Sequence, residues 1–308
     1  MSDRIVIVSD LHLGRPRSGA SSAEALRPIW KGASRLIVNG DVAEVHDPKH
    51  QAIAALETLK LSDLCETDEV ELTLLSGNHD PGITDLRHLT LAKDAVFVTH
   101  GDALHPAITP WSPGHDRIQS ANEAAMAHID PDDRESLESR LRASQHACYS
   151  EWKDLDRLAD EARHTSPLGM LFRPHAIIQV LRYWRSFPQM AARFGAIYAP
   201  RARFILMGHT HRAGIWDIDD RIIINTGAYG FPGRPRAAVI ENGKLQVHDV
   251  VRKGRTYRLA DNAVATYDVT PLPESAETGT PAEATDAETT PESTPIAEPH
   301  ETKRRRAA

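Results

Sequence analysis

Short apolar runs rich in β-branched residues recur along the first third of the chain. The four runs before residue 110 are Arg4–Ser9, Arg35–Val38, Val70–Ser76 and Ala95–Thr99. Helical stretches separate them, such as 48–59, where isoleucine and leucine recur at intervals of three residues. Buried strands that alternate with helices are typical of α/β proteins, so this region predicts an α/β sheet.

A second group of apolar runs follows late in the chain. These runs are Arg203–Met207, Arg221–Asn225, Ala237–Ile240 and Lys244–Asp249. An Asn-Gly pair at 242–243 separates the last two runs, which predicts a β-hairpin. We expect these strands to complete the domain that the first group begins.

Residues 115–200, between the two groups, show helical spacing throughout. Asp130 is a good N-cap for one helix, with Pro131 in its first turn. A second helix is expected from about His175 until Pro188 interrupts it. The pattern therefore predicts one domain over residues 1–260, interrupted at 115–200 by a helical insertion that forms a cap or a lid.

The composition changes at about Asp261. Residues 261–308 are dominated by Pro, Glu, Ser, Thr and Ala, show no periodicity, and end in the basic run Lys303–Arg306 before two alanines. A segment with so few large apolar side chains cannot offset the entropy that it would lose on ordering. We therefore expect a disordered C-terminal tail.

Bulk properties exclude several classes of protein. The formal net charge of −7 argues against a dedicated polyanion binder with a uniformly basic surface. The two cysteines, Cys65 and Cys148, are too few for a disulfide framework. No apolar run approaches the roughly 18 residues of a membrane span, and the first is too short for the core of a signal peptide. We expect a soluble, cytoplasmic protein.

Residues of metal-binding types stand directly after five of the apolar runs. They are Asp10, His12, Asp41, Asn78, His100, His209 and His211. Binding sites in α/β sheets form at the edge where the strands end. Residues two apart in an extended chain point the same way, so the D-x-H pair and the H-x-H pair should each face one spot. Gly40, Gly77 and Gly208 precede three of the blocks, where the backbone must turn tightly or pack closely.

This set combines four imidazoles, two carboxylates and one amide oxygen. Such nitrogen-rich sites suit Mn, Fe, Zn, Co or Ni better than Ca or Mg. Seven ligands are too many for one tetrahedral ion, but they suit two ions that share a carboxylate. Two ions roughly 3.5–4 Å apart can clamp a phosphoryl group and deprotonate a bridging water, which then attacks phosphorus. The pattern predicts a dinuclear hydrolase of phosphate esters or anhydrides.

The order D-x-H, G-D, G-N-H-D, H-G-D and G-H-x-H resembles the calcineurin-like metallophosphoesterase superfamily. The resemblance covers residues 4 to about 250, apart from the insertion, and implies a four-layer αββα sandwich of two mixed sheets. It implies one ion held by Asp10, His12 and His211, a second held by Asn78, His100 and His209, and Asp41 bridging the two. Two divalent transition-metal ions are the expected cofactors, with Mn as the first choice.

The same resemblance assigns the catalytic residues. It implies that His79 contacts the scissile phosphate and protonates or stabilises the leaving group, while Asp80 fixes the tautomer of His79. General acid–base chemistry agrees, because a carboxylate beside an imidazole raises its pKa and orients it. Glu44 is expected to order the loop that carries Asp41, and Arg15 and Arg17 are candidate contacts for a second phosphate or a leaving group.

The stretch from Ala162 to Trp216 contains eight arginines and no Asp or Glu. Aromatic residues are interleaved with the arginines, and this combination favours phosphate groups or anionic membrane surfaces. The alternative is an ordinary helical cap whose arginines pair with the acidic helix before it. Expected partners are a phosphorylated small molecule or lipid and, peripherally, an anionic membrane; nucleic acid is not expected.

Two other functions stay open. The Asp10–Gly14 opening and the insertion resemble UDP-2,3-diacylglucosamine pyrophosphohydrolases, although those lipid enzymes typically have Arg where this chain has His79. A function of another class, a non-catalytic scaffold or a nucleic-acid-binding module, would be expected to lack ligands or to present a basic groove. The complete ligand set and the acidic net charge disfavour both forms of it.

Overall fold

The computed structural model describes residues 3–15, 19–45, 48–112, 114–152, 174–230 and 233–273. Six strands form a first sheet in the order β11-β10-β9-β1-β2-β3. Their bounds are β1 (Ile5–Val8), β2 (Arg35–Asn39), β3 (Glu71–Leu75), β9 (Arg236–Glu241), β10 (Lys244–Lys253) and β11 (Thr256–Asp268). β1, β2 and β3 run parallel, while β9, β10 and β11 are antiparallel to their neighbours, so the sheet is mixed.

Five strands form the second sheet in the order β4-β5-β6-β8-β7. They are β4 (His88–Leu91), β5 (Val96–Thr99), β6 (Phe204–Met207), β7 (Gly214–Ile218) and β8 (Arg221–Asn225). The three central strands are parallel, and β4 and β7 are antiparallel edge strands. Every strand predicted from an apolar run is present, whereas β4, β7 and β11 were not predicted from the sequence.

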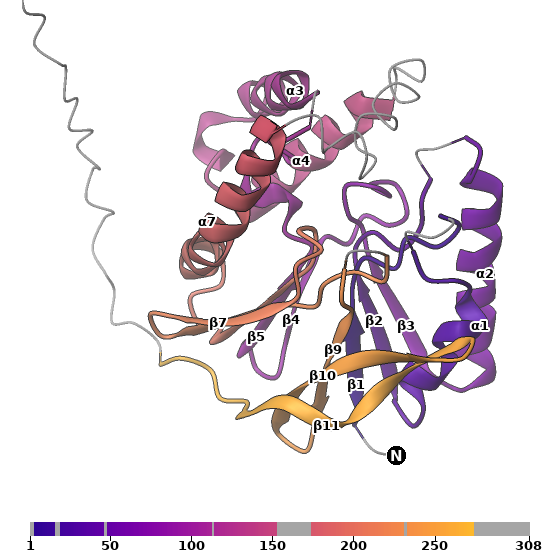
Figure 1. The fold of residues 1–308 in the computed structure, drawn as a ribbon. Coiled ribbons are helices and arrows are strands. Elements are labelled where there is room, and N and C mark those ends of the chain that lie inside the picture. The colour runs from indigo at the N-terminus through magenta and orange to yellow at the C-terminus, as the bar shows by residue number, and fades with distance from the viewer. Residues whose placement is uncertain are drawn as a thin grey trace, which may run out of the picture. The chain divides into compact units, whose positions relative to one another are not determined.

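Alternation along the strands builds the four layers. Ile7 of β1 packs between the two sheets, whereas Val6 faces the helices on the other side of the first sheet. In the same way, Leu206 of β6 faces the first sheet and Met207 faces away from it. The covering helices are α1 (Ala23–Leu26) and α2 (Gln51–Thr67) on the first sheet and α7 (Pro174–Tyr198) on the second. Figure 1 shows this arrangement, which confirms the predicted αββα sandwich.

The described part of the insertion is helical, as predicted. It consists of α3 (His115–Ala127), a short 3₁₀ helix at Pro131–Asp133, α4 (Leu137–Trp152) and α7. Residues 153–173 lie outside the described part. Asp130 caps the 3₁₀ helix, since its side chain accepts a hydrogen bond from the backbone of Asp132.

The prediction that Pro188 interrupts the second helix is wrong. α7 continues through Pro188 to Tyr198. Proline inside a helix costs about 3 kcal/mol, because it removes one hydrogen bond and crowds the preceding turn. Phe187 and Phe194 are buried against the second sheet on either side of it, and burial of two such side chains outweighs that cost.

The tail does not begin at Asp261, as the composition suggested. Residues 261–268 belong to β11, which pairs with β10 over its whole length. Tyr267 packs on Phe204, with ring centroids 5.5 Å apart, and joins the core between the sheets. The backbone hydrogen bonds that hold this segment come from β10, and amino-acid composition gives no indication of such a partner. The disorder predicted further on falls on residues 274–308, outside the described part. No helix among the described residues is long and apolar enough to cross a membrane.

Candidate metal centre

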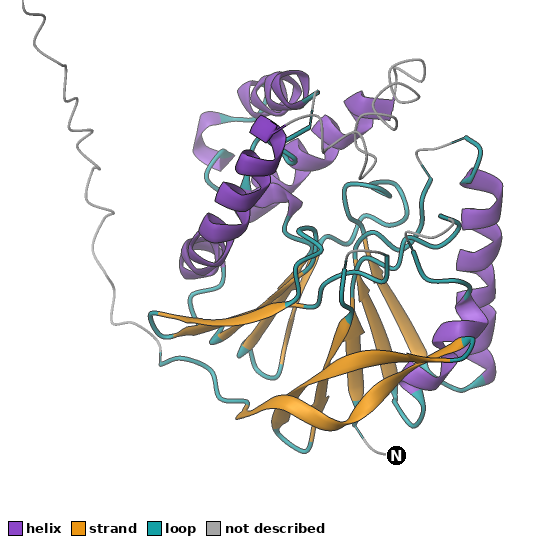
Figure 2. Ribbon diagram, viewed as in Figure 1, coloured by secondary structure: helices purple, strands orange, loops and turns teal. Residues whose placement is uncertain are grey.

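The candidate ligands all lie on loops at one edge of the two sheets. The loops after β1, β2 and β3 carry Asp10, His12, Asp41 and Asn78, and those after β5 and β6 carry His100, His209 and His211. Figure 2 shows these loops, in teal, gathered where the strands end. Buried Asn39 ties the two sheets together there, since its Nδ2 donates to the carbonyl oxygens of Thr99 (2.9 Å) and Leu206 (3.4 Å). The fold therefore brings all seven predicted ligands to one place.

Five of these residues have left-handed backbone conformations. The φ angles are 52° at Asp10, 46° at His12, 51° at Asp41, 66° at His209 and 57° at His211. Side chains disfavour this region, so the conformations persist because surrounding contacts hold them. The loop after β1 is held by the loop after β2, for example by His12 N–H donating to the carbonyl of Asp41 (2.9 Å). The expectation of an extended D-x-H segment is therefore wrong, although both side chains still reach the site.

The first group of ligand atoms surrounds His211. Its Nε2 lies 3.0 Å from Nε2 of His12 and 3.3 Å from Oδ1 of Asp10. Oδ2 of Asp41 lies 3.8 Å from the same nitrogen of His12. Three of these residues are buried, whereas 38% of the His211 side chain is exposed. The four residues form a cluster that could hold a metal ion and is accessible from one side.

The second group surrounds Oδ1 of Asn78. This oxygen lies 2.8 Å from Nδ1 of His209 and 3.2 Å from Nε2 of His100. The same nitrogen of His100 lies 3.3 Å from Oδ2 of Asp41. One oxygen of Asp41 thus faces both groups, which is the position of a bridging ligand.

Backbone carbonyls orient both imidazoles of the second group. Nδ1 of His100 lies 2.9 Å from the carbonyl oxygen of Asn39, and Nε2 of His209 lies 3.1 Å from that of Ile108. A carbonyl only accepts, so these two ring nitrogens carry the hydrogen. The other nitrogen of each ring, the one that faces Asn78, is therefore the one that can offer a lone pair to a metal ion once it is unprotonated.

Two glycines allow the ligand loops to approach each other. Gly40 has φ 78°, and a Cβ there would collide with the ring of His100. A Cβ at Gly208 would collide with the carboxylate of Asp10. Each glycine precedes one ligand and packs against a ligand from another loop, so side chains at these positions would push the two groups apart.

The donor set fits transition-metal ions. Ligands of such ions lie about 2.0–2.2 Å from the metal, which places neighbouring ligand atoms roughly 3.0–3.5 Å apart. Most of the separations within the two groups, 3.0, 3.2 and 3.3 Å, agree with that spacing. Among the described residues, no lysine or arginine pairs with the buried carboxylates of Asp10 and Asp41, whose charged neighbours are histidines. Buried negative charge of this kind is stabilised by a neighbouring positive charge, which protonated histidines or a bound metal ion can supply.

The structure exchanges the expected roles of Glu44 and Asp80. Nδ1 of His79 lies 3.1 Å from Oε1 of Glu44, so Glu44 sets its tautomer and orientation. The buried carboxylate of Asp80 instead accepts backbone N–H groups, those of Gly77, Asp41, Val42 and Ala43 at 2.6–3.2 Å. Asp80 therefore orders the loop that carries Asp41, and the predicted Asp80–His79 pairing is wrong. The carboxylate of Asp80, one residue away along the backbone, turns toward the loop that carries Asp41, and that same loop brings Glu44 to the ring of His79.

Glu44 has two further neighbours at the mouth of the site. Its Oε2 lies 3.6 Å from Nδ1 of His12 and accepts a hydrogen bond from Nη1 of Arg15 at 3.2 Å. The carboxylate thus contacts one candidate ligand, the candidate acid His79 and one arginine that is partly exposed. That Arg15 contacts a second phosphate stays a prediction, and Arg17 lies outside the described residues.

The electrostatic field keeps His79 protonated at neutral pH. Burial lowers its pKa, but the charges of Glu44 and Asp41 outweigh burial and raise the pKa to about 9. At His100, burial likewise lowers the pKa, and Asp41 raises it to about 10. Metal ions bind unprotonated imidazole, so an ion bound at His100 would displace a proton. Glu44, the first of the two carboxylates that raise the pKa of His79, lies outside the two groups of ligand atoms, although it forms a smaller cluster with His12 and His79.

The helical insertion packs on the ligand loop after β6. Nε1 of Trp184, on α7, donates to the carbonyl oxygen of Thr210 at 3.1 Å. The rings of Trp111 and Tyr183 lie near that of His209, with centroids 6.3 and 6.4 Å away. The insertion therefore forms one wall of the candidate metal centre.

Sequence reasoning missed two asparagines that organise the site. Asn39 is described above, and Asn225 donates from Nδ2 to the carbonyl oxygen of Gly208 (2.5 Å) and to Oγ1 of Thr210 (3.0 Å). Both are the last residue of a buried parallel strand, β2 and β8. A buried amide that ends an otherwise apolar run is a signal that could have identified them, because it must find partners in neighbouring loops.

Comparison with known proteins gives one family. The model of the calcineurin-like phosphoesterases matches residues 3–213. No curated protein matches the chain in sequence. Similar solved structures include a Vps29 double mutant from Entamoeba histolytica, with a TM-score of 0.40, 9% identity, and coverage of 85% of this chain and 99% of that one. Yfce, a phosphoesterase from E. coli, has a TM-score of 0.40 at 13% identity, with 87% and 100% covered.

Proposed function

Because the chain belongs to the calcineurin-like phosphoesterase family, we propose that it is a dinuclear metal-dependent hydrolase of phosphate esters or anhydrides. The position of Asp41 carries the proposal. Its Oδ2 lies 3.3 Å from Nε2 of His100 and 3.8 Å from Nε2 of His12, so one carboxylate oxygen faces both ligand groups. Such an oxygen suits two ions that share a ligand.

The metal ions would supply Lewis acidity toward the phosphoryl oxygens and an activated water nucleophile. Mn is the first ion to test, and Fe, Zn, Co and Ni also suit a set of imidazole, carboxylate and amide donors. Asp10, His12 and His211 would hold one ion, and Asn78, His100 and His209 the other, with Asp41 between them.

His79 would protonate or stabilise the leaving group. Its backbone N–H donates to Oδ1 of Asp41 at 2.8 Å, which places the imidazole at the border of the ligand set. The ring is partly exposed, and its centroid lies 4.9 Å from that of His12. With a pKa raised by Glu44 and Asp41, the imidazole carries a proton at neutral pH and can donate it to the departing oxygen. Glu44 would stabilise the cation and hold the ring.

Metal content and turnover together test this proposal. The purified chain should bind about two transition-metal ions and hydrolyse bis-p-nitrophenyl phosphate, and Asp41→Ala should lose both ions and all turnover. Asp63→Ala, an exposed aspartate on α2, is the matched control and should behave as wild type. Metal content is measured by elemental mass spectrometry. Full turnover in Asp41→Ala, or in the chelated wild type, would refute a metal mechanism.

A further inference from the structure

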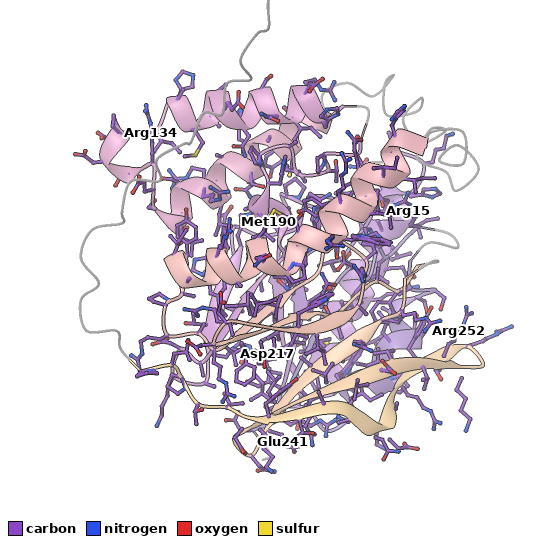
Figure 3. All side chains as sticks on the ribbon, turned by 60° about the vertical axis from the view of Figure 1, so that its left-hand side comes forward. Arg15, Arg134, Met190, Asp217, Glu241 and Arg252 are labelled. Atoms are coloured by element: carbon purple, nitrogen blue, oxygen red, sulfur yellow. The ribbon has the colours of Figure 1, made fainter. Side chains whose placement is uncertain are left out.

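A groove of about 610 Å³ lies between α7 and β7. The α7 side is formed by Ile178, Leu181, Arg182 and Arg185, and the β7 side includes Trp216. In Figure 3, α7, which carries the labelled Met190, crosses above the strand that carries Asp217, which is β7. A groove of this volume is the size of a small-molecule site.

The groove is linked to the metal centre through the loop after β6. Arg212, which lines it, directly follows His211 in sequence. Nη1 of Arg212 donates to the carbonyl oxygen of Trp184 at 3.3 Å, and Nε1 of Trp184 donates to that of Thr210 at 3.1 Å. The wall of the groove and the ligand loop are therefore parts of one hydrogen-bonded structure. A molecule held at the half-exposed His211 has the groove beside it.

The charge of the groove has one sign. Arg182, Arg185 and Arg212 line it, and no aspartate or glutamate is among the described residues that do so. Among the described residues, no carboxylate pairs with any of these three arginines. Along β7, Trp216 and Ile218 line the groove, while Asp217 lies between them and points to the other face of the strand. The alternative, in which these arginines pair with the acidic helix before them, finds no such pair in the described part of that helix, and residues 153–161 lie outside the described part.

Beside the arginines, the exposed apolar side chains of the groove are aliphatic and not aromatic. The exposed fractions of Ile178 and Leu181 are 45% and 55%, which leaves apolar area facing the groove. The guanidinium of Arg212 lies over the rings of both Trp184 (5.6 Å) and Trp216 (5.9 Å). A nucleobase needs a free aromatic face for stacking, and here a guanidinium covers one face of each ring while both rings are partly buried against the core under α7. An apolar chain needs only the aliphatic surface.

We propose that this groove binds the non-reacting part of the substrate, and that the substrate is an anionic amphiphile, a phosphate joined to an apolar chain. The arginines hold the anionic end near the metal centre, and the chain lies along Ile178 and Leu181. This proposal rests on the proposed phosphoesterase function, because only then is the bound molecule a substrate. Binding in the groove, however, is measured without turnover.

Binding of a non-hydrolysable lipid phosphate tests the groove. The ligand is the phosphonate analogue of dihexanoyl phosphatidic acid, which stays monomeric at working concentrations, titrated into the metal-loaded full chain by calorimetry. We expect it to bind at least tenfold more tightly than the phosphonate analogues of glycerol 3-phosphate, which has no apolar chain, and of adenosine 5′-phosphate. Equal affinity for the three, or tighter binding of the nucleotide, overturns the proposal.

Matched variants on one helix locate the binding. Arg182→Glu with Arg185→Glu should weaken binding of the phosphonate at least tenfold, whereas Arg193→Glu should not, because Arg193 is exposed on α7 outside the groove. Leu181→Ser should weaken it more than Ile197→Ser, at a residue that is 68% exposed on the same helix. Equal losses in groove and control variants would overturn the location.

The two proposals fail separately. If the wild type hydrolyses bis-p-nitrophenyl phosphate but shows no preference for the phosphonate, the groove assignment is wrong and the phosphoesterase function stands. If the phosphonate binds in the groove but no ester is hydrolysed by the metal-loaded chain, the groove assignment stands and the proposed function is wrong.

Discussion

Replacing Glu44 by Gln would show whether this carboxylate orients the candidate acid His79. The Oε1 atom of Glu44 lies 3.1 Å from Nδ1 of the imidazole, and the carboxylate charge is a main reason why the pKa of His79 is raised to about 9. A hydrogen bond to a charged group contributes about 1.5–3 kcal/mol. Since each 1.36 kcal/mol changes a rate about tenfold, we expect kcat to fall roughly 10- to 100-fold.

The assay must separate this loss from a loss of metal. Glu44 also lies 3.6 Å from Nδ1 of His12, and removing such an outer contact weakens metal binding by roughly 10- to 100-fold. Turnover of bis-p-nitrophenyl phosphate is therefore measured at saturating Mn²⁺, with metal content checked in the same samples. Under these conditions Glu44→Gln should contain its metal and still be slow.

Asp80→Asn is the informative contrast. Its carboxylate accepts four backbone N–H groups of the ligand loops, and an amide in its place can accept only on one side. Buried donors left unpaired cost about 1–3 kcal/mol each, so this variant should lose stability and metal affinity together. Normal kcat in Glu44→Gln at full metal content would refute the assigned role of Glu44. Slow turnover in a stable, fully loaded Asp80→Asn would return that role to Asp80.

Three further outcomes are expected. His79→Asn should keep its metal content while kcat falls roughly 10²- to 10⁴-fold, and an equal loss of metal would make His79 a ligand instead. A chain that ends at residue 260 should be less stable than one that ends at 273, by roughly 2 kcal/mol of unfolding free energy, because it loses the β11 pairing and the Tyr267–Phe204 contact. Its thermal midpoint should therefore be lower, and identical melting curves would contradict this. Burial raises the pKa of the Cys65 thiol to about 12, so about one molecule in 10⁴ is thiolate at pH 8, and a thiol-specific disulfide reagent should label Cys65 only after unfolding. Rapid labelling of Cys65 in the folded chain would show that it is accessible.

Local patterns predicted eight of the eleven described strands and a set of candidate ligands that lie together in the structure. Alternation along runs such as Arg4–Ser9 places every second side chain on one face, and that face is buried against the other sheet or a helix. Ligand types directly after several such runs indicate a common site, because the ends of parallel strands meet at one edge. Both inferences need only residue spacing, and residue spacing is a property of the sequence.

Elements stabilised by partners far along the chain were misjudged. α7 passes through Pro188 because Phe187 and Phe194 are buried against the second sheet. β11 extends to Asp268 because β10 offers it an edge to pair with. In both cases the local propensity is unfavourable, and the compensating free energy comes from contacts that composition cannot reveal.

The assignment of roles within the site also depended on the tertiary structure. Asp80 is adjacent to His79 in sequence, but its carboxylate turns into the loop of Asp41, while Glu44 arrives from the loop after β2 to contact the ring. The sequence by itself determined which residues are at the sheet edge, because strand ends are a local property. Which carboxylate meets which imidazole was decided only when two loops, ordered by left-handed residues and close glycine contacts, packed against each other. Two side chains pair when they are close in space. Their separation in sequence predicts that distance only when both lie in the same helix or strand.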